Sequence, residues 1–543
     1  MSTLNILMAQ LNTHVGDFEG NTEKVIDAVT RAEQHCEHPV VVFPELTLSG
    51  YPPEDLLLRP SIELRIEQSL QRLCGAMQGS AYAVVGYPRR EDGVLYNVAG
   101  VLHRGEIVAE YRKQCLPNYQ VFDEKRYFAP GDSPCVVDIR GVRVGLSICE
   151  DIWEEAPTRQ VAAAGADLLL NINSSPYHRG KREKRWELVG KRARDAGIPI
   201  VYVNQVGGQD ELVFDGGSFA VDGGGQVIGA APNFEEGDYW LVAEFGAGEP
   251  ALSGLGVAAP LQELAATWRA LALGVRDYVN KNGFPGIVLG LSGGVDSALT
   301  LAVAVDALGP ERVEAVMMPF RYTSRMSVED AAEQAETLGV SYKVISIEPL
   351  YDAFMTSLAA EFEGRAPDTT EENLQARCRG VLLMSISNKK GVLVLTTGNK
   401  SEMAVGYSTL YGDMAGGFDV LKDVPKTLVF DLCRYRNSLG PCIPQRVIDR
   451  PPSAELAPDQ KDEDSLPPYD VLDEILEMYV EQDMSAEAII AAGMDREQVY
   501  RVVRLVDLNE YKRRQAPIGV RITQRGFGRD RRYPITSGWK IGD

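Results

Sequence analysis

The stretch Gly286-Ile-Val-Leu-Gly-Leu-Ser-Gly-Gly-Val-Asp-Ser297 decides the fold of the second half of this chain. An apolar run of strand character ends at Leu291, a glycine pair turns the chain, and the apolar segment that follows has helical character. Backbone N–H groups in a glycine turn can approach an anion closely, and a helix N-terminus adds positive potential. The stretch therefore predicts a pyrophosphate site. A glycine-rich turn without a ligand is the alternative, and the strand and helix around the turn weigh against it.

The turn lacks the lysine of the G-x-x-x-x-G-K-[ST] phosphate loop, but Asp296 can recruit Mg²⁺ to neutralise phosphate charge. The pattern SGGxDS resembles the PP-loop of enzymes that split ATP into AMP and pyrophosphate and so activate an oxygen as an adenylate. The resemblance implies a Rossmann-like PP-loop ATP pyrophosphatase domain with a parallel sheet. It also implies that ATP contacts the following residues: Gly290, Leu291, Ser292, Gly293, Gly294, Val295, Asp296 and Ser297.

Composition limits the classes of protein that remain. A chain of 543 residues is expected to form two or more domains. The net charge of −22 argues against a nucleic-acid partner, which needs a basic face. The N-terminus does not have the pattern of a signal peptide, and no apolar run has membrane-spanning length. The eight cysteines form no C-x-x-C pair, which argues against a zinc site or a disulfide framework and favours a cytoplasmic location.

The order of expected elements divides the chain at a glycine-rich segment. Strand-like segments are expected at 4–11, 39–44, 81–87, 94–104, 142–149, 166–173 and 199–205, with helices at 21–35, 158–164 and 183–196 and a turn at 89–93. This mixture predicts a layered α/β domain over 1–245, followed by a linker at 246–262. The second domain, 263–543, is expected to alternate strands at 313–319, 341–347 and 392–396 with helices at 260–281, 328–338, 350–360 and 370–388. The acid-rich segment 451–469 is expected to be a surface loop without chemistry.

Three reactive side chains stand at the ends of strand-like segments in the first half. Glu45 follows Val40-Val-Val-Phe-Pro44, Lys113 follows the segment 105–112, and Cys149 closes Gly145-Leu-Ser-Ile148. A thiol needs a nearby base to become a strong nucleophile, and a fixed ammonium can stabilise a charged tetrahedral intermediate. Taken singly, each residue has an ordinary alternative: a small core residue for the cysteine and solvated charges for the other two.

Taken together, Phe43-Pro-Glu45, Tyr111-Arg-Lys113 and Ile148-Cys-Glu-Asp151 resemble the nitrilase, or carbon–nitrogen hydrolase, superfamily. The resemblance implies an αββα sandwich over residues 1–245. It also implies a catalytic triad in which Glu45 is the general base, Lys113 the stabilising cation and Cys149 the nucleophile that accepts the acyl group.

Two further segments resemble those of the glutamine-using members of that superfamily. They are Leu116-Pro-Asn-Tyr-Gln-Val-Phe-Asp-Glu-Lys-Arg-Tyr-Phe128 and Asn173-Ser-Ser-Pro-Tyr-His-Arg-Gly-Lys181. The resemblance implies that Tyr119, Ser175 and Lys181 contact glutamine and that Glu124 assists the triad. Ordinary loop polarity is the alternative for the three binding residues.

The motifs after the PP-loop narrow the acceptor. The segments 371–377, 396–402, 406–413 and 509–517 closely resemble those of NAD synthetases, and with the first half the chain resembles the glutamine-dependent NAD⁺ synthetase family over its whole length. The resemblance implies that the nucleotide and acceptor are held by these residues: Thr397 for ATP; Asn373, Glu402 and Lys512 for the dinucleotide; Asp296 and Glu402 for Mg²⁺. It further implies that Asp413 lies near the incoming ammonia and Lys426 near a substrate phosphate, although a solvated surface charge is the alternative for Lys426.

The resemblance implies a ligase that converts nicotinic acid adenine dinucleotide into NAD⁺ with ATP and with ammonia taken from glutamine. We expect an enclosed passage for ammonia between the domains, and a homo-oligomer that is at least a dimer. Three alternatives remain: an amidase regulated by nucleotide, a nucleotide-binding scaffold, and a ligase with another acceptor. The complete set of ATP and dinucleotide residues argues against the regulated amidase, and the intact triad argues against the scaffold. Only the identity of the product can decide which acceptor a ligase uses.

Overall fold

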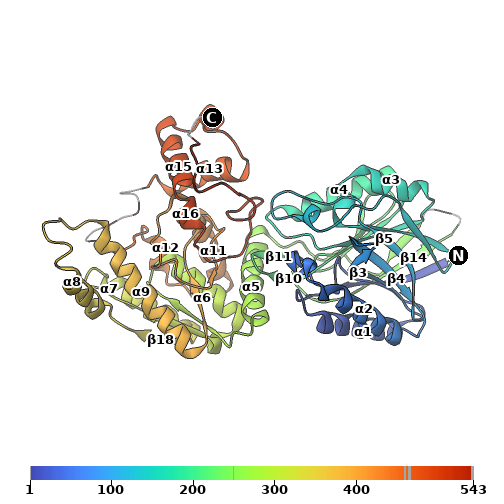
Figure 1. The fold of residues 1–543 in the computed structure, drawn as a ribbon, viewed down its shortest axis with the longest axis horizontal. Coiled ribbons are helices and arrows are strands. Elements are labelled where there is room, and N and C mark those ends of the chain that lie inside the picture. The colour runs from blue at the N-terminus through green and yellow to red at the C-terminus, as the bar shows by residue number, and fades with distance from the viewer. Residues whose placement is uncertain are drawn as a thin grey trace. The chain divides into compact units, whose positions relative to one another are not determined.

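The computed structural model describes residues 2–539 except 247, 249, 458, 459, 461 and 463–465. The chain divides into two compact units, Met1–Gln262 and Glu263–Asp543 (Figure 1). Part of the acid-rich segment 451–469, for which a surface loop is predicted, lies outside the described residues.

The described residues of the first unit form two large sheets and a two-stranded ribbon. The seven-stranded sheet has the order β15 (Ala251–Ser253), β14 (Gly237–Phe245), β1 (Ser2–Gln10), β2 (Val40–Val42), β3 (Tyr82–Glu91), β4 (Val94–His103), β5 (Glu106–Arg112). The six-stranded sheet has the order β13 (Val227–Ala230), β12 (Phe219–Val221), β9 (Ile200–Asn204), β8 (Leu168–Asn173), β7 (Val142–Ile148), β6 (Cys135–Ile139). The ribbon consists of β10 (Val206–Gln209) and β11 (Leu212–Asp215).

Successive side chains of β1 point to opposite faces of the sheet, and this alternation shows how the layers form. Leu4, Ile6 and Met8 face a core shared with the second sheet, through Leu146 and Leu170 among others. The residues between them, at 7 and 9, face the helices α1 (Phe18–His35) and α2 (Ser61–Ala76). A third core joins the second sheet to α3 (Glu155–Ala163) and α4 (Lys181–Ala196). The order is helices, sheet, sheet, helices (Figure 1), which confirms the predicted αββα sandwich.

Two details of the first unit differ from the prediction. The turn expected at 89–93 is limited to Asp92 and Gly93, both with positive φ, because residues 89–91 continue β3. Two such residues form the tight hairpin turn whose twist matches the strands. The predicted linker also contains β15, which pairs with β14 at the edge of the sheet.

The second unit contains a parallel sheet with helices on both faces. Its order is β18 (Ser341–Val344), β17 (Val313–Met317), β16 (Ile287–Gly290), β19 (Leu393–Thr396), β20 (Phe418–Asp419). The chain moves outward from β16 in one direction and then returns to add β19 on its other side. Ligands of such sheets bind beyond the carboxyl ends of the strands where the order reverses, here β16 and β19. The predicted Rossmann-like class is confirmed.

The helices of this unit are as follows: α5 (Glu263–Lys281), α6 (Val295–Leu308), α7 (Arg325–Leu338), α8 (Glu348–Leu358), α9 (Thr369–Lys390), α10 (Lys400–Val405), α11 (Lys426–Leu439), α12 (Gln445–Asp449), α13 (Tyr469–Leu476), α14 (Ala486–Ala491), α15 (Arg496–Leu508), α16 (Glu510–Arg513). Helix α9 packs on the sheet through Leu374, Cys378 and Leu383. Helices α13, α14 and α15 form a separate apolar core with the end of α10 (Figure 1). Within the part of the chain that the structure describes, none of these helices combines the length and apolar character needed to cross a membrane.

Candidate active sites

Glu45 lies three residues beyond the carboxyl end of the buried strand β2 and has no exposed surface. Its carboxylate accepts hydrogen bonds from Asn97 Nδ2 (2.8 Å) on β4 and from the backbone N–H of Ser174 (3.1 Å) after β8. The neighbouring strand allows this position because it carries glycine at 86, where an added Cβ would lie 2.4 Å from the backbone nitrogen of Leu46. Burial and these donors fix one orientation of the carboxylate.

Lys113 follows β5 and is also fully buried. Its Nζ atom donates to Glu45 Oε1 at 2.7 Å and to both oxygens of Glu124, at 2.9 and 2.8 Å. Tyr51 adds a hydrogen bond from its hydroxyl to Glu124 Oε1 (3.0 Å). A buried ammonium is tolerated only where it is paired, and here two carboxylates pair with it.

Cys149 stands at the sharp turn where β7 ends and a short 3-10 helix, Cys149–Ile152, begins. Its φ of 44° is unusual for a residue that carries a side chain, and strain of this kind concentrates at functional sites. Asp151 holds the turn: its carboxylate accepts the backbone N–H of Ile148 (3.0 Å) and of Cys115 (2.8 Å) and the Tyr111 hydroxyl (2.8 Å). Asp151 therefore ties the thiol turn to the segment that carries Lys113.

The three groups influence one another electrostatically. Burial, and then the charge of Glu45, raise the pKa of the Cys149 thiol well above its usual value. Burial acts to lower the pKa of Lys113, but Glu124, Glu45 and the thiol overcome it, so that this pKa is raised and the side chain stays cationic. The resting state of these two residues is therefore a thiol and an ammonium.

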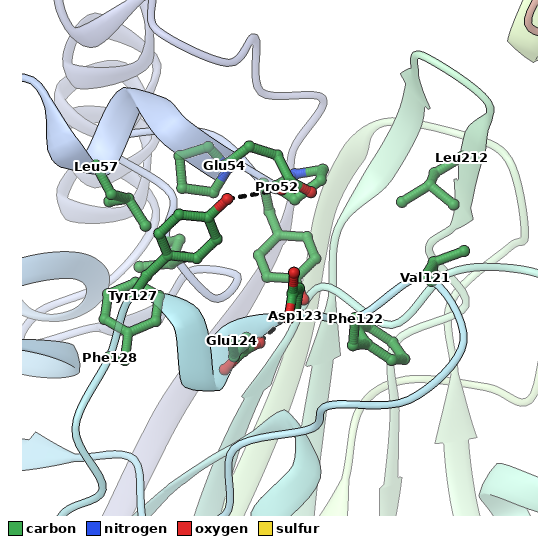
Figure 2. A pocket seen from close by; sticks show the side chains of 13 residues that line it. Pro52, Glu54, Leu57, Val121, Phe122, Asp123, Glu124, Tyr127, Phe128 and Leu212 are labelled. Carbon is green, nitrogen blue, oxygen red and sulfur yellow. Dashed lines mark hydrogen bonds between the residues drawn. The ribbon is translucent and has the colours of Figure 1, made fainter. Parts of the chain in front are cut away.

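Glu124 borders a small, mainly apolar cavity of about 20 Å³. Figure 2 shows Leu57, Tyr127 and Phe128 on one side of it and Val121, Phe122 and Leu212 on the other, with Glu124 between them. Burial, the largest cause, raises the pKa of Glu124 to about 7, and the charge of Glu45 adds to this while Lys113 opposes it. Glu124 can therefore exchange a proton near neutral pH.

The raised thiol pKa predicts the pH dependence of alkylation. The pKa of the Cys149 thiol lies above the ordinary value of 9.0. The thiolate fraction of Cys149 at pH 7 is therefore below about 1%. We expect iodoacetamide to modify Cys149 slowly at pH 7 and faster as the pH rises through 9, as measured by peptide mass spectrometry.

Glu45→Gln separates reactivity from catalysis. Loss of the negative charge lowers the thiol pKa, so that alkylation of Cys149 accelerates while glutamine hydrolysis is lost. A wild-type alkylation rate that is already constant between pH 6 and 9 would contradict this description of the thiol.

The glutamine-binding candidates fall into two groups. Tyr119 is half exposed, and its hydroxyl donates to Glu150 Oε1 at 3.0 Å. Burial, the largest cause, raises the pKa of Glu150, and the positive charge of Lys181 is close enough to oppose this rise. The Lys181 Nζ atom lies 4.3 Å from the centre of the Trp153 ring. Glu150 directly follows Cys149. The sequence prediction missed it, although an acidic residue beside a nucleophile is visible in the sequence.

Ser175 belongs to a buried network. Its hydroxyl accepts Arg185 Nη2 (3.1 Å), and its backbone N–H donates to Asn204 Oδ1 (2.9 Å). The Arg185 guanidinium is held by both oxygens of Asp215, at 2.8 and 2.9 Å. Both of these bonds come from Nη1, which leaves Nη2 to donate to the Ser175 carbonyl as well (2.7 Å), so that Arg185 fixes the strand end that carries Ser175.

In the second unit, the PP-loop joins β16 to α6 at the reversal of strand order. Ser292 Oγ lies 3.0 Å from Ser297 Oγ and accepts the backbone N–H of Gly294 at 3.1 Å, which closes the loop on itself. Gly293 has a φ of 80°, and an added Cβ would lie 2.3 Å from the Ser327 carbonyl. Arg450 donates to the Gly293 carbonyl and to the Ser327 hydroxyl. The N-terminus of α6 therefore opens onto a loop of fixed shape, as an anion site requires.

Asp296 and Glu402 meet at Lys426. The Lys426 Nζ atom lies 2.5 Å from Asp296 Oδ2 and 3.1 Å from Glu402 Oε1. Its side chain is 2% exposed, so that the alternative of a solvated surface lysine is wrong. Burial, the largest cause, and the charge of Asp296 raise the pKa of Glu402 to about 8, against the opposing charge of Lys426. Asn399 joins the group by donating to Asp296 Oδ1 (2.9 Å).

Asn373, Asp413 and Lys512 gather around the segment 406–413. The Thr409 hydroxyl donates to Asn373 Oδ1 (2.8 Å), and its backbone N–H donates to Asp413 Oδ1 (2.8 Å). Lys512 Nζ donates to the carbonyls of Gly406 (2.7 Å) and Ser408 (2.9 Å). Burial raises the pKa of Asp413 to about 6, and Lys512 opposes the rise. Thr397 is half-buried immediately after β19.

Comparison with known proteins covers both units. The carbon–nitrogen hydrolase family matches residues 6–245, and the NAD synthase family matches residues 267–516. The glutamine-dependent NAD(+) synthetase of Acinetobacter baylyi is 48% identical over 100% of this chain and 100% of its own length. That of Xanthomonas campestris pv. campestris is 52% identical over 99% of this chain and 98% of its own.

Solved structures extend the comparison. The glutamine-dependent NAD+ synthetase of Acinetobacter baumannii, solved with adenosine diphosphate, is similar with a TM-score of 0.80 and 48% identity over 100% of both chains. The enzyme of Cytophaga hutchinsonii, 23% identical, shares the fold with a TM-score of 0.83 over 99% of this chain and 98% of its own.

Proposed function

Because this chain belongs to the family of glutamine-dependent NAD(+) synthetases, we propose that its two units divide one reaction between the residues described above. The first unit releases ammonia from glutamine. The second activates the carboxylate of nicotinic acid adenine dinucleotide with ATP and replaces the activated oxygen with nitrogen. The products are NAD⁺, AMP, pyrophosphate and glutamate.

In the first step, the Glu45 carboxylate takes the thiol proton and the Cys149 sulfur attacks the carboxamide carbon of glutamine. The oxygen of that carboxamide becomes negative, and the Lys113 ammonium stabilises it. Glu45 then returns the proton to the leaving nitrogen, ammonia departs, and water hydrolyses the thioester to glutamate. Glu124 supports Lys113 and keeps it cationic.

Glutamine recognition follows from complementary charges. The substrate carries an α-carboxylate and an α-ammonium. Lys181 supplies a positive charge for the first, and the Glu150 carboxylate, held by Tyr119, supplies a negative charge for the second. Ser175 is positioned by Arg185 at the strand end beside Glu45.

In the second unit, an oxygen of the nicotinate carboxylate attacks the α-phosphorus of ATP and pyrophosphate leaves. The backbone N–H groups of the PP-loop and the N-terminus of α6 bind the pyrophosphate, and Thr397 contacts ATP. Asn373, Glu402 and Lys512 hold the dinucleotide. Ammonia then attacks the acyl-adenylate carbon near Asp413, and AMP leaves with the bonding electrons.

A magnesium ion fits the carboxylate pair of the second unit. Asp296 and Glu402 offer the hard oxygen ligands that Mg²⁺ prefers, and their oxygens already hold a positive charge, the Lys426 ammonium, between them. No group of three or more acidic, histidine or cysteine side chains suited to a metal occurs among the described residues. Two carboxylates would suffice to hold Mg²⁺ where the phosphates of a substrate and water supply the other ligands. Bound there, the ion would neutralise the charge on the phosphates.

The observation that carries the proposal is the buried ammonium of Lys113 between Glu45 and Glu124, beside a thiol, in a chain that also carries a PP-loop. The test is incubation of the purified protein with ATP, Mg²⁺, nicotinic acid adenine dinucleotide and either glutamine or ammonium. With either nitrogen source, we expect NAD⁺ and AMP to form in a one-to-one ratio. If neither source gives NAD⁺, nicotinic acid adenine dinucleotide is not the acceptor.

Self-association is supported by an apolar surface on α8 and α9. Helix α8 has no buried residue, and Leu350, Phe354 and, on α9, Val381 are 37%, 45% and 56% exposed. We propose a two-fold dimer across this surface, since a patch of this kind can be self-complementary. Sedimentation should show at least a dimer, and Phe354→Glu should shift it toward the monomer.

The eight free cysteines support the proposed cytoplasmic location.

A further inference from the structure

A buried arginine of the first unit holds the short helix that carries the nucleophile. Arg192 lies on α4 and is 6% exposed. Its Nε atom donates to the Ile152 carbonyl (3.0 Å), and its Nη2 atom donates to the Trp153 carbonyl (2.5 Å). These carbonyls lie at the C-terminal end of the 3-10 helix Cys149–Ile152. The last carbonyls of a helix lack partners within it, and a cation beside them interacts favourably with the helix dipole.

The surroundings of Arg192 differ from those of an ordinary buried ion pair. The nearest carboxylate oxygen recorded for it belongs to Glu155, lies 3.8 Å from Arg192 Nη1 and is part of a side chain that is 46% exposed. The Nη1 atom has no hydrogen-bond partner among the described residues. A buried charge is costly unless it is closely paired. The close contacts of this cation are therefore with the two carbonyls rather than with a carboxylate.

The short helix depends on contacts of this kind for its shape, because a single helical turn is marginally stable by itself. At its N-terminal end, the Asp151 carboxylate accepts the backbone N–H of Ile148 (3.0 Å). At its C-terminal end, Arg192 binds the carbonyls. Cys149 lies between these contacts with a φ of 44°, and such a backbone conformation persists only where the surroundings enforce it.

The same face of α4 holds the second segment of the site. Arg185 precedes Arg192 by seven residues, which is about two helical turns, so that both side chains lie on one face. Arg185 Nη2 donates to the carbonyls of Ser175 (2.7 Å) and Pro176 (3.2 Å). Lys181, which is predicted to contact glutamine, is the first residue of α4. One helix therefore connects the expected substrate contacts with the nucleophile.

We propose that Arg192 is a positioning residue of the glutaminase reaction, which fixes the direction in which the Cys149 thiol faces the glutamine carboxamide. The proposal rests on the proposed function and deepens it. Arg192 acts on the thiol through the short helix, and it forms no bond to the substrate in the proposed mechanism. Attack by sulfur requires the reacting atoms to meet within a narrow range of distance and angle, and a displacement of about 1 Å costs about 10²-fold in rate.

Position, rather than charge, is the means by which Arg192 acts. Burial and then four charged neighbours shift the pKa of the Cys149 thiol, and these neighbours are Glu45, Lys113, Glu150 and Glu124. Arg192 is not one of them. The pH dependence of thiol alkylation by iodoacetamide should therefore be the same with and without Arg192, whereas the rate of attack on glutamine should differ.

Three variants test this role. Arg192→Met removes both hydrogen bonds and keeps the apolar stem of the side chain. Arg192→Lys keeps the charge and its donors but loses the planar fork of the guanidinium. Lys191→Met is the matched control, because Lys191 is an exposed cation on α4 whose Nζ atom lies 4.0 Å from the same Glu155 oxygen.

The number of competent sites is measured first, by titration with 6-diazo-5-oxo-L-norleucine, a glutamine analogue that alkylates nucleophilic thiols. Glutamate release is then expressed per titrated site. Arg192→Met should still take up about one label per chain, while its kcat per titrated site falls by about 10²-fold and its KM for glutamine stays within about threefold of the wild type. Arg192→Lys should restore kcat to between about a tenth and a third of the wild-type value. Lys191→Met should match the wild type.

Three outcomes would overturn the proposal. An unchanged kcat per titrated site in Arg192→Met would make the residue a support of folding alone. A rise confined to the KM for glutamine would assign it to substrate binding, and a shifted pH profile of alkylation would show that it acts through its charge. If Arg192→Met does not fold, Arg192→Lys decides by the same criteria.

Failure of the proposed function is distinguishable from failure of this inference. In the first case the wild-type protein itself would release no glutamate from glutamine. In the second case the wild type would be active and the variants would not differ from it per titrated site. NAD⁺ formation from ammonium reports the second unit and should stay within about twofold of the wild type in all three variants.

Discussion

Replacing Cys149 by alanine is expected to abolish NAD⁺ formation from glutamine and to leave NAD⁺ formation from ammonium intact. The Cys149 thiol is the group proposed to bond covalently with glutamine, and the buried Glu45 and Lys113 act on it electrostatically. Loss of a nucleophile typically costs on the order of 10⁴–10⁶ in rate. The measurement is the rate of NAD⁺ formation from each nitrogen source in the purified variant.

Cys135→Ala is the matched control, because Cys135 is a partly buried cysteine on β6, at the edge of the same sheet as β7. It should leave both activities near the wild-type rate. Glutamine-dependent synthesis that survives in Cys149→Ala would remove the thiol from the mechanism. Loss of the ammonium-dependent rate as well would show that the change damages the second unit.

Replacing Asp296 by asparagine is expected to lower NAD⁺ formation from glutamine and from ammonium equally. The change keeps the size of the side chain but removes a proposed metal ligand and one of the two carboxylates that pair with buried Lys426. Removal of one electrostatic contact of this kind typically costs about 10²–10³ in rate. Adenylation is affected directly, so that pyrophosphate exchange should fall with it.

Glutamine hydrolysis in the Asp296→Asn variant reports on the first unit. Glutamate release should persist, because Glu45, Lys113 and Cys149 are untouched. Asp431→Asn, an exposed carboxylate of the second unit, should behave as the wild type. Equal rates of pyrophosphate exchange in wild type and Asp296→Asn would exclude the assigned role.

Local patterns placed the reactive groups at the ends of strands, and the resemblance to known families singled them out from other polar residues. Glu45, Cys149 and the PP-loop each stand at the end of an apolar strand, and in layered α/β folds the carboxyl ends of parallel strands meet at one edge. The alternation along β1 and the helical periodicity of α1 likewise depend on neighbours in sequence. These features follow from patterns a few residues long.

The supporting residues were not predictable in this way. Tyr51, Asn97, Asp151 and Ser174 reach the first site from four different segments, and each is an ordinary polar residue within its own. Only the fold shows that Asn97 and Ser174 donate to the carboxylate of Glu45. A buried polar residue within the apolar run of β4 is the one signal that could have identified Asn97.

The burial of Lys426 could not be predicted from the sequence for the same reason. A lone lysine after Asp423-Val-Pro425 is ordinarily solvated. Its burial depends on Asp296 and Glu402, which lie 130 and 24 residues away in sequence. Partners at this separation are visible only in the folded chain.

The measurement that tests the account most directly is the fate of the glutamine amide nitrogen. The wild-type protein is supplied with glutamine labelled with ¹⁵N at the amide, ATP, Mg²⁺, nicotinic acid adenine dinucleotide and an excess of unlabelled ammonium. If ammonia passes from the first unit to the second without release, as expected from the sequence, the NAD⁺ carries ¹⁵N in its carboxamide and forms in step with glutamate and AMP. NAD⁺ whose label is diluted to the proportion of the mixed nitrogen pool would contradict the enclosed passage, and glutamate formed without labelled NAD⁺ would contradict the coupling of the two units.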